Sequence, residues 1–573
     1  MLNRSLLALA APLALASTLG ACATVANDAP TAQSAGVGTV SAADPRAQAA
    51  GMAILREGGN ATDAAIATML ALNVVEPQSS GIGGGGFIVR GAADGTVETY
   101  DGREKAPAGA TPDWFLTPDG QLPPFEASRK SGLSVGVPGN LALAALAHRE
   151  HGKLPWAKLF APAIALARDG FEINPRLNQS IAETADRAGW TAEGRALYFT
   201  AEGQPRPVGD TIVNEELART FEAIAAQGPE AFYTGPRAKA LAETVDAHTP
   251  HAGAMTPADL ADYEAKERDA VCGTYRQYRV CGMGPPTSGG IAVLQILGEL
   301  ERFDLAKLGV QNPETWHLFL EAQRLAYADR ELYAADSDFV RVPVAGLIDP
   351  AYLARRSALI QPNSTMATVR AGTPVGADTA LADGDEPEEH GTSHFAVVDG
   401  SNTMVSYTST IESAFGSGLM TGGFFLNNEM TDFSRSPTVD GRPVANRVEG
   451  NKRPRSSMAP VVVYDPQGRP FLAIGAAGGA TIPVQTARSI IGVIDFGLSA
   501  QDALGMPFIM QYDDAVMVEQ GTWMERAMDR FRALGHENIM ARAAPVKANA
   551  VLRTPEGWEG ARDPRVEDKL SLP

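Results

Sequence analysis

The chain reads Glu389-His390-Gly391-Thr392-Ser393-His394-Phe395 where a long polar loop gives way to an apolar strand. Residues 377–390 are rich in Asp, Glu, Gly and Ala and show little apolar periodicity. The apolar run 395–398 and the turn 399–402 follow, which is the pattern of a strand entering a hairpin. Thr392 therefore stands at the start of a core strand, behind a loop whose cleavage would make it a chain N-terminus.

A threonine in this place can serve as a nucleophile once the bond before it is cut. Cleavage between Gly391 and Thr392 gives Thr392 a free α-amine, and the ordinary α-amine pKa of about 7.7–8.0 suits a general base near neutral pH. A threonine hydroxyl paired with its own amine is a recognised nucleophile–base arrangement. The alternative is an ordinary threonine that begins a strand.

Ordered motifs occur on both sides of Thr392. They are Gly58-Gly59-Asn60-Ala61-Thr62-Asp63-Ala64-Ala65, Gly83-Gly84-Gly85-Gly86-Phe87, Arg103-Glu104-Lys105-Ala106-Pro107, Thr392-Ser393-His394-Phe395, Phe415-Gly416-Ser417-Gly418, Leu426-Asn427-Asn428-Glu429-Met430-Thr431-Asp432-Phe433, Asn451-Lys452-Arg453-Pro454-Arg455-Ser456-Ser457-Met458 and Gly475-Ala476-Ala477-Gly478-Gly479. From about residue 36 to its end the chain thus resembles the γ-glutamyltransferases (glutathione hydrolases), which are self-processing N-terminal-nucleophile hydrolases. The resemblance implies an α+β fold, a four-layer αββα sandwich that two subunits cut from one precursor form jointly.

The resemblance also assigns catalytic roles. Thr392 is the nucleophile, Thr410 is the partner of its hydroxyl or amine, and Gly478 and Gly479 form the oxyanion hole. Hairpin pairing places Thr410 close to Thr392 as well: with residue 398 facing residue 403, Thr392 lies opposite Ser409 and diagonal to Thr410. Backbone N–H groups at a glycine-rich helix start also suit a developing oxyanion.

A γ-glutamyl donor is a zwitterion, which needs hydrogen-bond donors for its α-carboxylate and acceptors for its α-ammonium. The resemblance assigns the two groups of residues: Arg103, Ser456 and Ser457 for the carboxylate, and Glu412, Glu429 and Asp432 for the ammonium.

The sequence departs from the family pattern in two places. Many members have Asn at the position of Glu412 and Gln at the position of Glu429, so the site of this chain is more acidic than theirs. The loop between Phe433 and Asn451 is shorter than an active-site lid and lacks the tyrosine that caps the site in relatives, which indicates tolerance of larger donors.

The implied reaction is a two-step acyl transfer from glutathione or a related γ-glutamyl compound to water or to an amino-acid or dipeptide acceptor. The resemblance implies no metal and no organic cofactor. One alternative is a glutaryl or cephalosporin-type acylase on the same scaffold, whose substrate lacks the α-ammonium that Asp432 and Glu429 would bind. A second is an inactive lipoprotein that keeps the fold as a binding module, although the intact Thr392 argues against it.

The N-terminus predicts export. Residues 1–21 read as a secretory signal peptide, and Leu19-Gly20-Ala21-Cys22 resembles a lipoprotein cleavage site, which predicts lipidation of Cys22. The alternative is an ordinary cut at Ala21-Cys22-Ala23. Residues 22–40 read as a tether, 41–391 as a mainly helical large subunit and 392–573 as the small catalytic subunit of a heterodimer. We expect a periplasmic protein, anchored in the outer rather than the inner membrane.

Composition and cysteines agree with this assignment. The 573 residues are 45% hydrophobic and 20% charged, as in soluble globular proteins, and a net charge of −19 argues against nucleic acid. After the signal segment no run reaches the roughly 18 apolar residues of a spanning helix, so membrane contact is expected only through a lipid anchor. Cys272 and Cys281 predict a disulfide in an exported protein, the alternative being two reduced buried thiols.

Periodicity predicts the main elements. We expect two helices within 45–75 joined by a Gly58–Asn60 cap. The other expected helices cover 140–151, 156–169, 215–227 and 315–332, and the strands lie within 85–102, within 272–282 and after 392. The glycine loop 81–86 lacks the Gly-Lys-Ser/Thr ending of a phosphate loop. The loop 361–391 is too long for passive structure, and we expect it to serve processing.

Overall fold

A computed structural model describes residues 36–250, 253–384, 391–512, 514–567 and 569–570. The expected signal peptide, Cys22 and most of the expected tether lie outside these residues. The tether was expected to reach residue 40, but strand β1 (Gly38–Ala42) already begins at Gly38. The reason is burial, because Val40 pairs with Val397 and is 1% exposed.

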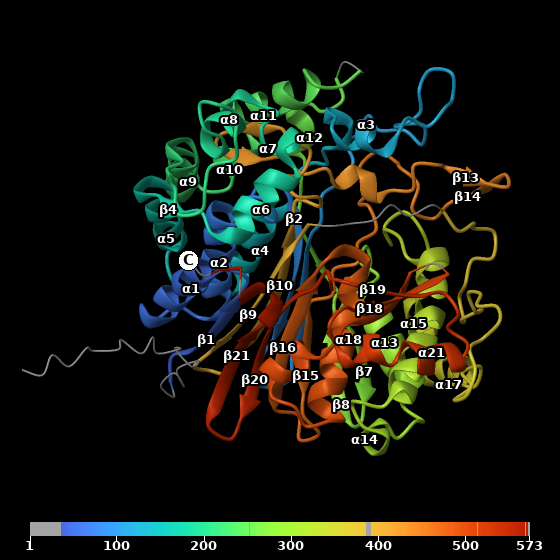
Figure 1. Cartoon of the computed structure of the whole chain (residues 1–573). Coiled ribbons are helices and arrows are strands. Elements are labelled where there is room, and N and C mark those ends of the chain that lie inside the picture. The colour runs from blue at the N-terminus through green and yellow to red at the C-terminus, as the bar shows by residue number, and fades with distance from the viewer. Residues whose placement is uncertain (1–35, 251–252, 385–390, 513, 568, 571–573) are drawn as a thin grey trace, which may run out of the picture. The chain divides into compact units, whose positions relative to one another are not determined.

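Two six-stranded sheets form the centre of the molecule (Figure 1). In order across the first sheet, the strands are β1, β9 (Ser393–Asp399), β10 (Met404–Thr410), β2 (Gly85–Gly91), β3 (Val97–Gly102) and β6 (Lys266–Arg268). In order across the second, they are β21 (Gly557–Arg562), β20 (Lys547–Thr554), β16 (Pro470–Ala477), β15 (Val461–Tyr464), β8 (Tyr278–Gly282) and β7 (Val271–Tyr275). Neighbouring strands in both sheets run antiparallel.

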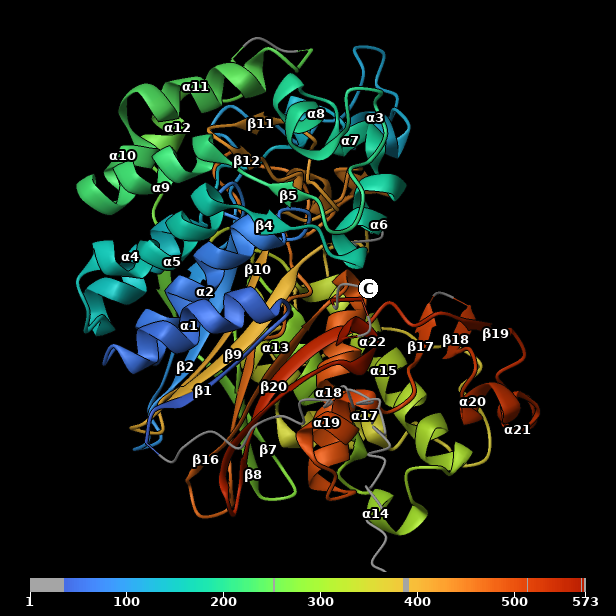
Figure 2. The ribbon, with the colours of Figure 1, turned by 60° about the vertical axis from the view of Figure 1, so that its left-hand side comes forward.

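Helices cover the outer face of each sheet, while β9 and β10 of the first sheet pack on β16 of the second. On the first sheet lie α1 (Pro45–Arg56), α2 (Ala61–Val75) and α4 (Asn140–His151); on the second lie α13 (Gly289–Leu300), α18 (Ile482–Ile494) and α19 (Ala500–Gly505). Figure 2 shows the α1–α2 layer on one side of the paired sheets and α18 and α19 on the other. The predicted αββα sandwich is confirmed.

The remaining elements surround this sandwich. The other α-helices are α3 (Phe125–Arg129), α5 (Trp156–Asp169), α6 (Pro175–Glu183), α7 (Ala185–Ala188), α8 (Ala192–Tyr198), α9 (Glu215–Gln227), α10 (Glu230–Tyr233), α11 (Gly235–Asp246), α12 (Pro257–Ala261), α14 (Leu305–Leu308), α15 (Pro313–Tyr333), α16 (Val344–Leu347), α17 (Pro350–Ser357), α20 (Trp523–Arg526), α21 (Met528–Ala533) and α22 (Pro564–Glu567). The short strands are β4 (Phe171–Glu172), β5 (Thr211–Ile212), β11 (Met420–Thr421), β12 (Phe424–Phe425), β13 (Thr438–Val439), β14 (Arg442–Pro443), β17 (Ile509–Tyr512), β18 (Ala515–Glu519) and β19 (Ile539–Arg542).

Strand β9 is buried on both faces, which explains its continuous apolar sequence. Phe395 and Val397 join the hydrophobic cluster beneath α2. Ala396 and Val398 point the other way and join the cluster between the two sheets. The residue period of two along a strand thus fills two core layers from one segment.

The predicted helix pair at the N-terminus is confirmed. Helix α2 starts at a capping box, in which the Asn60 side chain accepts from the Asp63 amide at 3.0 Å and the Asp63 carboxylate accepts from the Asn60 amide at 3.1 Å. Helix α2 ends at Val75 with Glu76 as its C-cap. Every residue of α2 is buried, because the helix packs on α1, α5 and the sheet.

The register of the β9–β10 hairpin differs from the expected one by one residue. Val398 pairs with Met404 rather than with residue 403. The Asp399 carboxylate causes the difference: it accepts from the backbone N–H of Ser401 at 2.8 Å and of Thr403 at 3.1 Å, which closes a longer turn. Ser409 therefore faces Ser393. The same register, continued by one residue, brings Thr410 opposite Thr392, and their hydroxyls are 3.1 Å apart.

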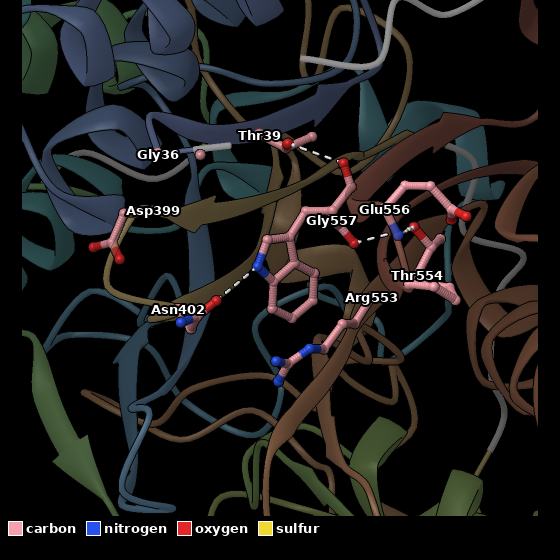
Figure 3. A pocket seen from close by; sticks show the side chains of 12 residues that line it. Gly36, Thr39, Asp399, Asn402, Arg553, Thr554, Glu556 and Gly557 are labelled. Atoms are coloured by element: carbon pink, nitrogen blue, oxygen red, sulfur yellow. Dashed lines mark hydrogen bonds between the residues drawn. The ribbon is translucent and has the colours of Figure 1, made fainter. Parts of the chain in front are cut away.

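A hollow of about 280 Å³ lies at the turn end of this hairpin, at the opposite end of β9 from Thr392 (Figure 3). Two hydrogen bonds join its walls: the Trp558 indole donates to Asn402 at 2.9 Å, and the Thr39 hydroxyl donates to the Trp558 carbonyl at 3.3 Å. The first attaches the β9–β10 turn, and the second attaches strand β1, to the β20–β21 hairpin.

Cys272 and Cys281 face each other across β7 and β8, with Cα atoms 4.1 Å apart, and form the expected disulfide. Within the described ranges, no helix has the length and apolarity to cross a bilayer. The same ranges contain no group of three or more His, Cys, Asp or Glu side chains arranged to hold a metal ion.

Candidate active site

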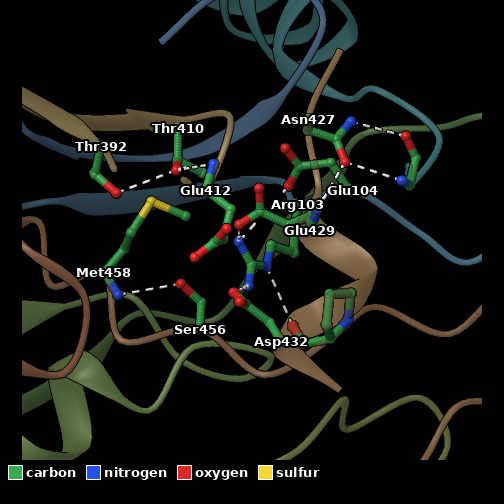
Figure 4. Close-up of polar contacts among 12 residues, drawn as sticks. Arg103, Glu104, Thr392, Thr410, Glu412, Asn427, Glu429, Asp432, Ser456 and Met458 are labelled. Carbon is green, nitrogen blue, oxygen red and sulfur yellow. Dashed lines mark hydrogen bonds and ion pairs between the residues drawn. The ribbon is translucent and has the colours of Figure 1, made fainter. Parts of the chain in front are cut away.

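Thr392 lies at the upstream end of β9 with its side chain facing β10 (Figure 4). Its hydroxyl donates to the Thr410 hydroxyl at 3.1 Å. The Thr410 hydroxyl also accepts from the backbone N–H of Glu412 at 2.8 Å. The two hydroxyls are thus in contact, as hairpin pairing led us to expect, and the catalytic role of Thr410 stays a prediction.

The backbone at the expected cleavage point is held in an unusual conformation. Thr392 has φ 114°, a region that β-branched residues strongly disfavour. A side chain on Gly391 would place its Cβ atom 1.4 Å from the Glu412 carbonyl oxygen, so only glycine fits there. The backbone is therefore strained at Thr392, on one side of the bond, and tightly packed at Gly391, on the other.

The glycine loop before β2 supports the strand that carries Thr410. At Gly84 a Cβ atom would lie 2.0 Å from the Thr410 carbonyl oxygen, so only glycine permits this approach of two backbones. The loop supports the wall of the site, which agrees with its lack of a phosphate-loop ending.

Arg103 is the centre of a buried ionic cluster on the other side of the site (Figure 4). Its guanidinium forms ion pairs with Glu429 and, at 2.5 Å, with Asp432. It also donates to the carbonyl oxygens of Pro454 at 3.2 Å and Arg455 at 2.7 Å. These contacts join the segment before Ser456 to the short helical turn Glu429–Asp432.

Acidic groups outnumber the guanidinium in this cluster. Glu104 is a third carboxyl within reach, its Oε2 atom lying 3.7 Å from Arg103. Burial raises the pKa of Glu104 to about 7, against the opposing effect of Arg103. Three carboxyl groups thus share one guanidinium, and such an excess of negative charge favours an added cation.

Glu412 links the ionic cluster to the two threonines. Its backbone binds Thr410, as described, and its carboxylate accepts a hydrogen bond from the side-chain amide of Asn428. Asn428 directly precedes Glu429 of the cluster. Figure 4 shows the Glu412 side chain reaching from the Thr410 end toward Arg103.

Ser456 and Ser457, which were expected to bind the donor's α-carboxylate together with Arg103, lie beside the cluster and are buried. The Ser456 hydroxyl accepts from the Met458 amide at 3.1 Å, and the Ser457 hydroxyl accepts from Arg330 at 2.6 Å. Arg103 reaches the same segment through the carbonyls of the two preceding residues, Pro454 and Arg455. Arg330, from α15, is a second buried cation at the site that no sequence motif indicated.

Gly478 and Gly479 open the turn that leads into α18, as expected. The φ of 121° at Gly478 requires glycine, and the φ of 56° at Gly479 favours it. The preceding residue, Ala477, pairs with Lys547 on β20. The Lys547 ammonium donates to the Thr392 carbonyl at 3.0 Å, which places the glycine turn at the same end of the sandwich as the nucleophile candidate.

Lys547 belongs to a second polar cluster, behind Thr392. Besides the Thr392 carbonyl, its ammonium donates to the Ser393 hydroxyl at 2.9 Å and to the Glu76 carboxylate at 2.8 Å. Glu76 also forms an ion pair with Arg176 on α6. Sequence reasoning missed this cluster, because its members come from four distant segments with no shared motif.

The sequence model of the gamma-glutamyltranspeptidase family matches residues 47–572. The chain belongs to this family.

Curated relatives agree with the assignment. The glutathione hydrolase proenzyme of Bacillus subtilis (strain 168) is 38% identical over 87% of this chain and 85% of its own length. That of Escherichia coli (strain K12) is 37% identical over 93% of this chain and 91% of its own length. An acylase proenzyme of Pseudomonas sp. (strain V22) is 34% identical over 90% of this chain and 89% of its own length.

Among solved structures, the cephalosporin acylase from Bacillus halodurans superposes with a TM-score of 0.81 at 27% identity, over 95% of this chain and 97% of that one. The gamma-glutamyltranspeptidase of Helicobacter pylori gives a TM-score of 0.57 at 36% identity, over 59% of this chain and 97% of that one. The family thus contains relatives named for γ-glutamyl transfer or hydrolysis and others named for acylase activity.

Proposed function

We propose that the protein is a self-processing γ-glutamyltransferase that acts on glutathione and related γ-glutamyl compounds. The observation that carries this proposal is the buried cluster of Arg103 with Glu429 and Asp432, linked through Glu412 to the Thr392–Thr410 pair. A γ-glutamyl group carries a carboxylate and an ammonium on one carbon, so it needs both signs of charge at one end of the site.

Processing is the first step of the proposed mechanism. Cleavage of the Gly391–Thr392 bond releases the α-amine of Thr392 and relaxes the φ of 114° that the intact chain imposes. The hydroxyl of Thr392, in contact with Thr410, is the attacking group. Glutathione hydrolases of Bacillus subtilis and Escherichia coli are named as proenzymes, which supports a cut in this chain.

Acyl transfer follows in two steps. The Thr392 hydroxyl attacks the γ-carbonyl carbon while its α-amine takes the proton, and the N–H groups of Gly478 and Gly479 stabilise the oxyanion. The carbon–nitrogen bond of the donor then breaks. The donor's leaving amine takes up the proton from the α-amine of Thr392, and a glutamyl–Thr392 ester remains. Water or an acceptor amine then attacks the ester and restores Thr392.

Donor recognition rests on charge. The three acidic side chains Glu412, Glu429 and Asp432 would bind the α-ammonium, with Arg103 balancing part of their charge and facing the α-carboxylate. Ser456 and Ser457 border the same place, and their neighbour Arg330 adds a second cation for the carboxylate.

A second candidate is an acylase that removes glutaryl-type groups. The close superposition on the cephalosporin acylase favours it, as does the short loop 434–450, which forms the β13–β14 hairpin. Such donors have no ammonium, and the acidic excess around Arg103 then has no function in binding. The donors of the two candidate enzymes thus differ in one charged group, the α-ammonium.

The deciding experiment compares γ-glutamyl-p-nitroanilide with glutaryl-p-nitroanilide for the wild type and Asp432→Asn. We expect Asp432→Asn to reduce the ratio of kcat/KM values for glutamyl over glutaryl by roughly tenfold or more, the loss of a hydrogen bond to a charged group. Asp119→Asn, in an exposed loop, is the control. Equal losses on both donors would show that Asp432 only supports the structure, and a wild type that prefers glutaryl would establish the acylase.

Export and lipid anchoring remain part of the proposal. A secretory signal at residues 1–21 and lipidation of Cys22 would place the enzyme in the periplasm, on the outer membrane. Detergent-phase partitioning of the wild type but not of Cys22→Ala would support the anchor, and equal partitioning would contradict it.

A further inference from the structure

The nucleophile candidate is bordered on its far side by a buried ionic cluster that the proposed chemistry does not use. Lys547 is 7% exposed and Glu76 is 1% exposed. The Lys547 ammonium makes three hydrogen bonds, to the Thr392 carbonyl, the Ser393 hydroxyl and the Glu76 carboxylate. A lysine at this depth carries a desolvation cost, and its contact with the reacting residue itself needs an explanation.

Its neighbours leave the cluster with net positive charge. Two cations, Lys547 and Arg176, share the single carboxylate of Glu76. Asp44, the next acidic group, forms an ion pair with Arg46 at 2.7 Å and also acts on Lys547, whose pKa its negative charge raises. On the opposite side, Glu412 faces Asn428 and the Arg103 cluster. One positive charge therefore remains beneath the backbone of Thr392.

Lys547 depends on Glu76 to stay charged. Burial lowers the pKa of Lys547 well below its ordinary value, and the charge of Arg176 lowers it further. The Glu76 carboxylate, 2.8 Å from the ammonium, stabilises the protonated form. The C-terminal end of α2 thus supplies the group that holds a cation against Thr392.

We propose that Lys547, braced by Glu76 and Ser393, is a positioning residue that fixes the carbonyl of Thr392 and keeps the α-amine of that residue unprotonated at neutral pH. The inference rests on the proposed function, since it assumes that processing releases this amine. A positive charge on the carbonyl side of Thr392 disfavours a second positive charge on its amine. The amine can then accept the hydroxyl proton without first losing one to solvent.

The size of the effect follows from Coulomb attraction and repulsion. A unit charge about 5 Å away shifts a pKa by about 0.5 to 2 units for effective dielectric constants between about 80 and 20. Removal of the Lys547 charge should therefore move the acidic limb of the kcat/KM profile upward by that amount. A role in anchoring alone would lower kcat and leave the limb in place.

The test measures kcat/KM for γ-glutamyl-p-nitroanilide against pH in the processed wild type, Lys547→Met and Lys547→Arg. We expect Lys547→Met to move the acidic limb upward by about 0.5 to 2 pH units and Lys547→Arg, which keeps the charge, to leave it near the wild-type position. Lys266→Met, which removes a charge from a partly exposed lysine, is the control and should not move the limb. An unmoved limb in a processed Lys547→Met enzyme overturns the inference.

Arg176→Met decides the matter if Lys547→Met is not processed. This variant leaves the Lys547 contacts in place and removes the second cation. An upward shift of the acidic limb of kcat/KM, smaller than that expected for Lys547→Met, supports the inference, and an unchanged limb overturns it. A wild type without γ-glutamyl activity would instead count against the proposed function, and the cluster would then have no base to regulate.

Discussion

At the scale of single residues, the site is built from side chains of opposite charge that partly neutralise one another. Arg103 offsets Glu429 and Asp432, and Glu76 offsets Lys547 and Arg176. All members except the partly exposed Arg176 are buried, so removing one of them leaves the others uncompensated. Charge in this protein therefore serves both the chemistry and the stability of the site.

Arg103→Ala should destabilise the whole protein as well as weaken donor binding. It leaves Glu429, Asp432 and Glu104 buried without their cation, a loss of about 3–5 kcal/mol in the free energy of unfolding. Chemical denaturation of purified wild type and variant measures this directly. Arg219→Ala, at an exposed ion pair on α9, is the matched control. A variant as stable as the wild type would show that the cluster is hydrated.

Thr410→Val tests the contact between the two threonines. The substitution keeps the shape and removes the hydroxyl that accepts from Thr392 at 3.1 Å and from the Glu412 amide at 2.8 Å. Each lost hydrogen bond is worth about 0.5–1.5 kcal/mol, so the loss of both should slow processing and turnover by roughly 5- to 150-fold. The half-time of precursor cleavage on a denaturing gel gives the result, and unchanged rates would exclude a role for this hydroxyl.

Residue roles could be predicted from sequence only where a motif marks them. Ordered motifs and strand pairing identified Thr392, Thr410 and the glycine pair, which the structure brings to one end of the sandwich, while their catalytic roles stay predictions. Lys547 and Arg330 could not be found, since a lone cation on a strand or helix has no local signature. The direct contact of Arg103 with Glu429 and Asp432 was not predicted either. Arg103 had been assigned to the carboxylate of the donor and the two acidic residues to its ammonium, so no contact between them was expected.

At the scale of elements, the apolar periodicity of the sequence predicts the helices. The hydrogen bonds of the turn between β9 and β10 set the register of that hairpin. Helices α4, α5 and α9 match their expected bounds, because their apolar spacing and their flanking residues agree. The β9–β10 register was missed by one residue, since the hydrogen bonds of Asp399 lengthen the turn. One residue of register decides whether Thr392 meets Ser409 or Thr410.

The cross-strand disulfide of β7 and β8 should stabilise the second sheet without serving the chemistry. Its loop is short, with a sequence separation of 9, so the chain-entropy contribution is about 2–3 kcal/mol at most. We expect Cys272→Ser with Cys281→Ser to lower the Tm and to leave kcat/KM within about twofold. The comparison needs thermal unfolding and kinetics on the same samples, and a loss of activity at temperatures where the variant is folded would contradict the prediction.

At the scale of the whole molecule, both sheets combine strands from the two sides of the Gly391–Thr392 bond. β9 and β10 insert between β1 and β2, and β7 and β8 complete the sheet that holds β15 and β16. Neither side can therefore bury its own sheet alone. The sandwich itself could be predicted only through the family resemblance, because strand order is not written in local sequence.

The two fragments should stay together after processing. Because their strands are hydrogen-bonded within shared sheets, we expect the fragment that ends at Gly391 and the fragment 392–573 to co-elute in native gel filtration as one particle. They should separate only in denaturant. Elution of the smaller fragment by itself under native conditions would contradict the shared-sheet architecture.

The intact mass of the smaller fragment tests the central claim most directly. We expect purified wild-type protein to yield a fragment whose mass corresponds to residues 392–573, with Thr392 as its first residue. We expect Thr392→Ala to remain one uncut chain. A fragment that begins at another residue, or a Thr392→Ala protein that is still cut at this bond, would contradict the claim that Thr392 is the processing and catalytic nucleophile.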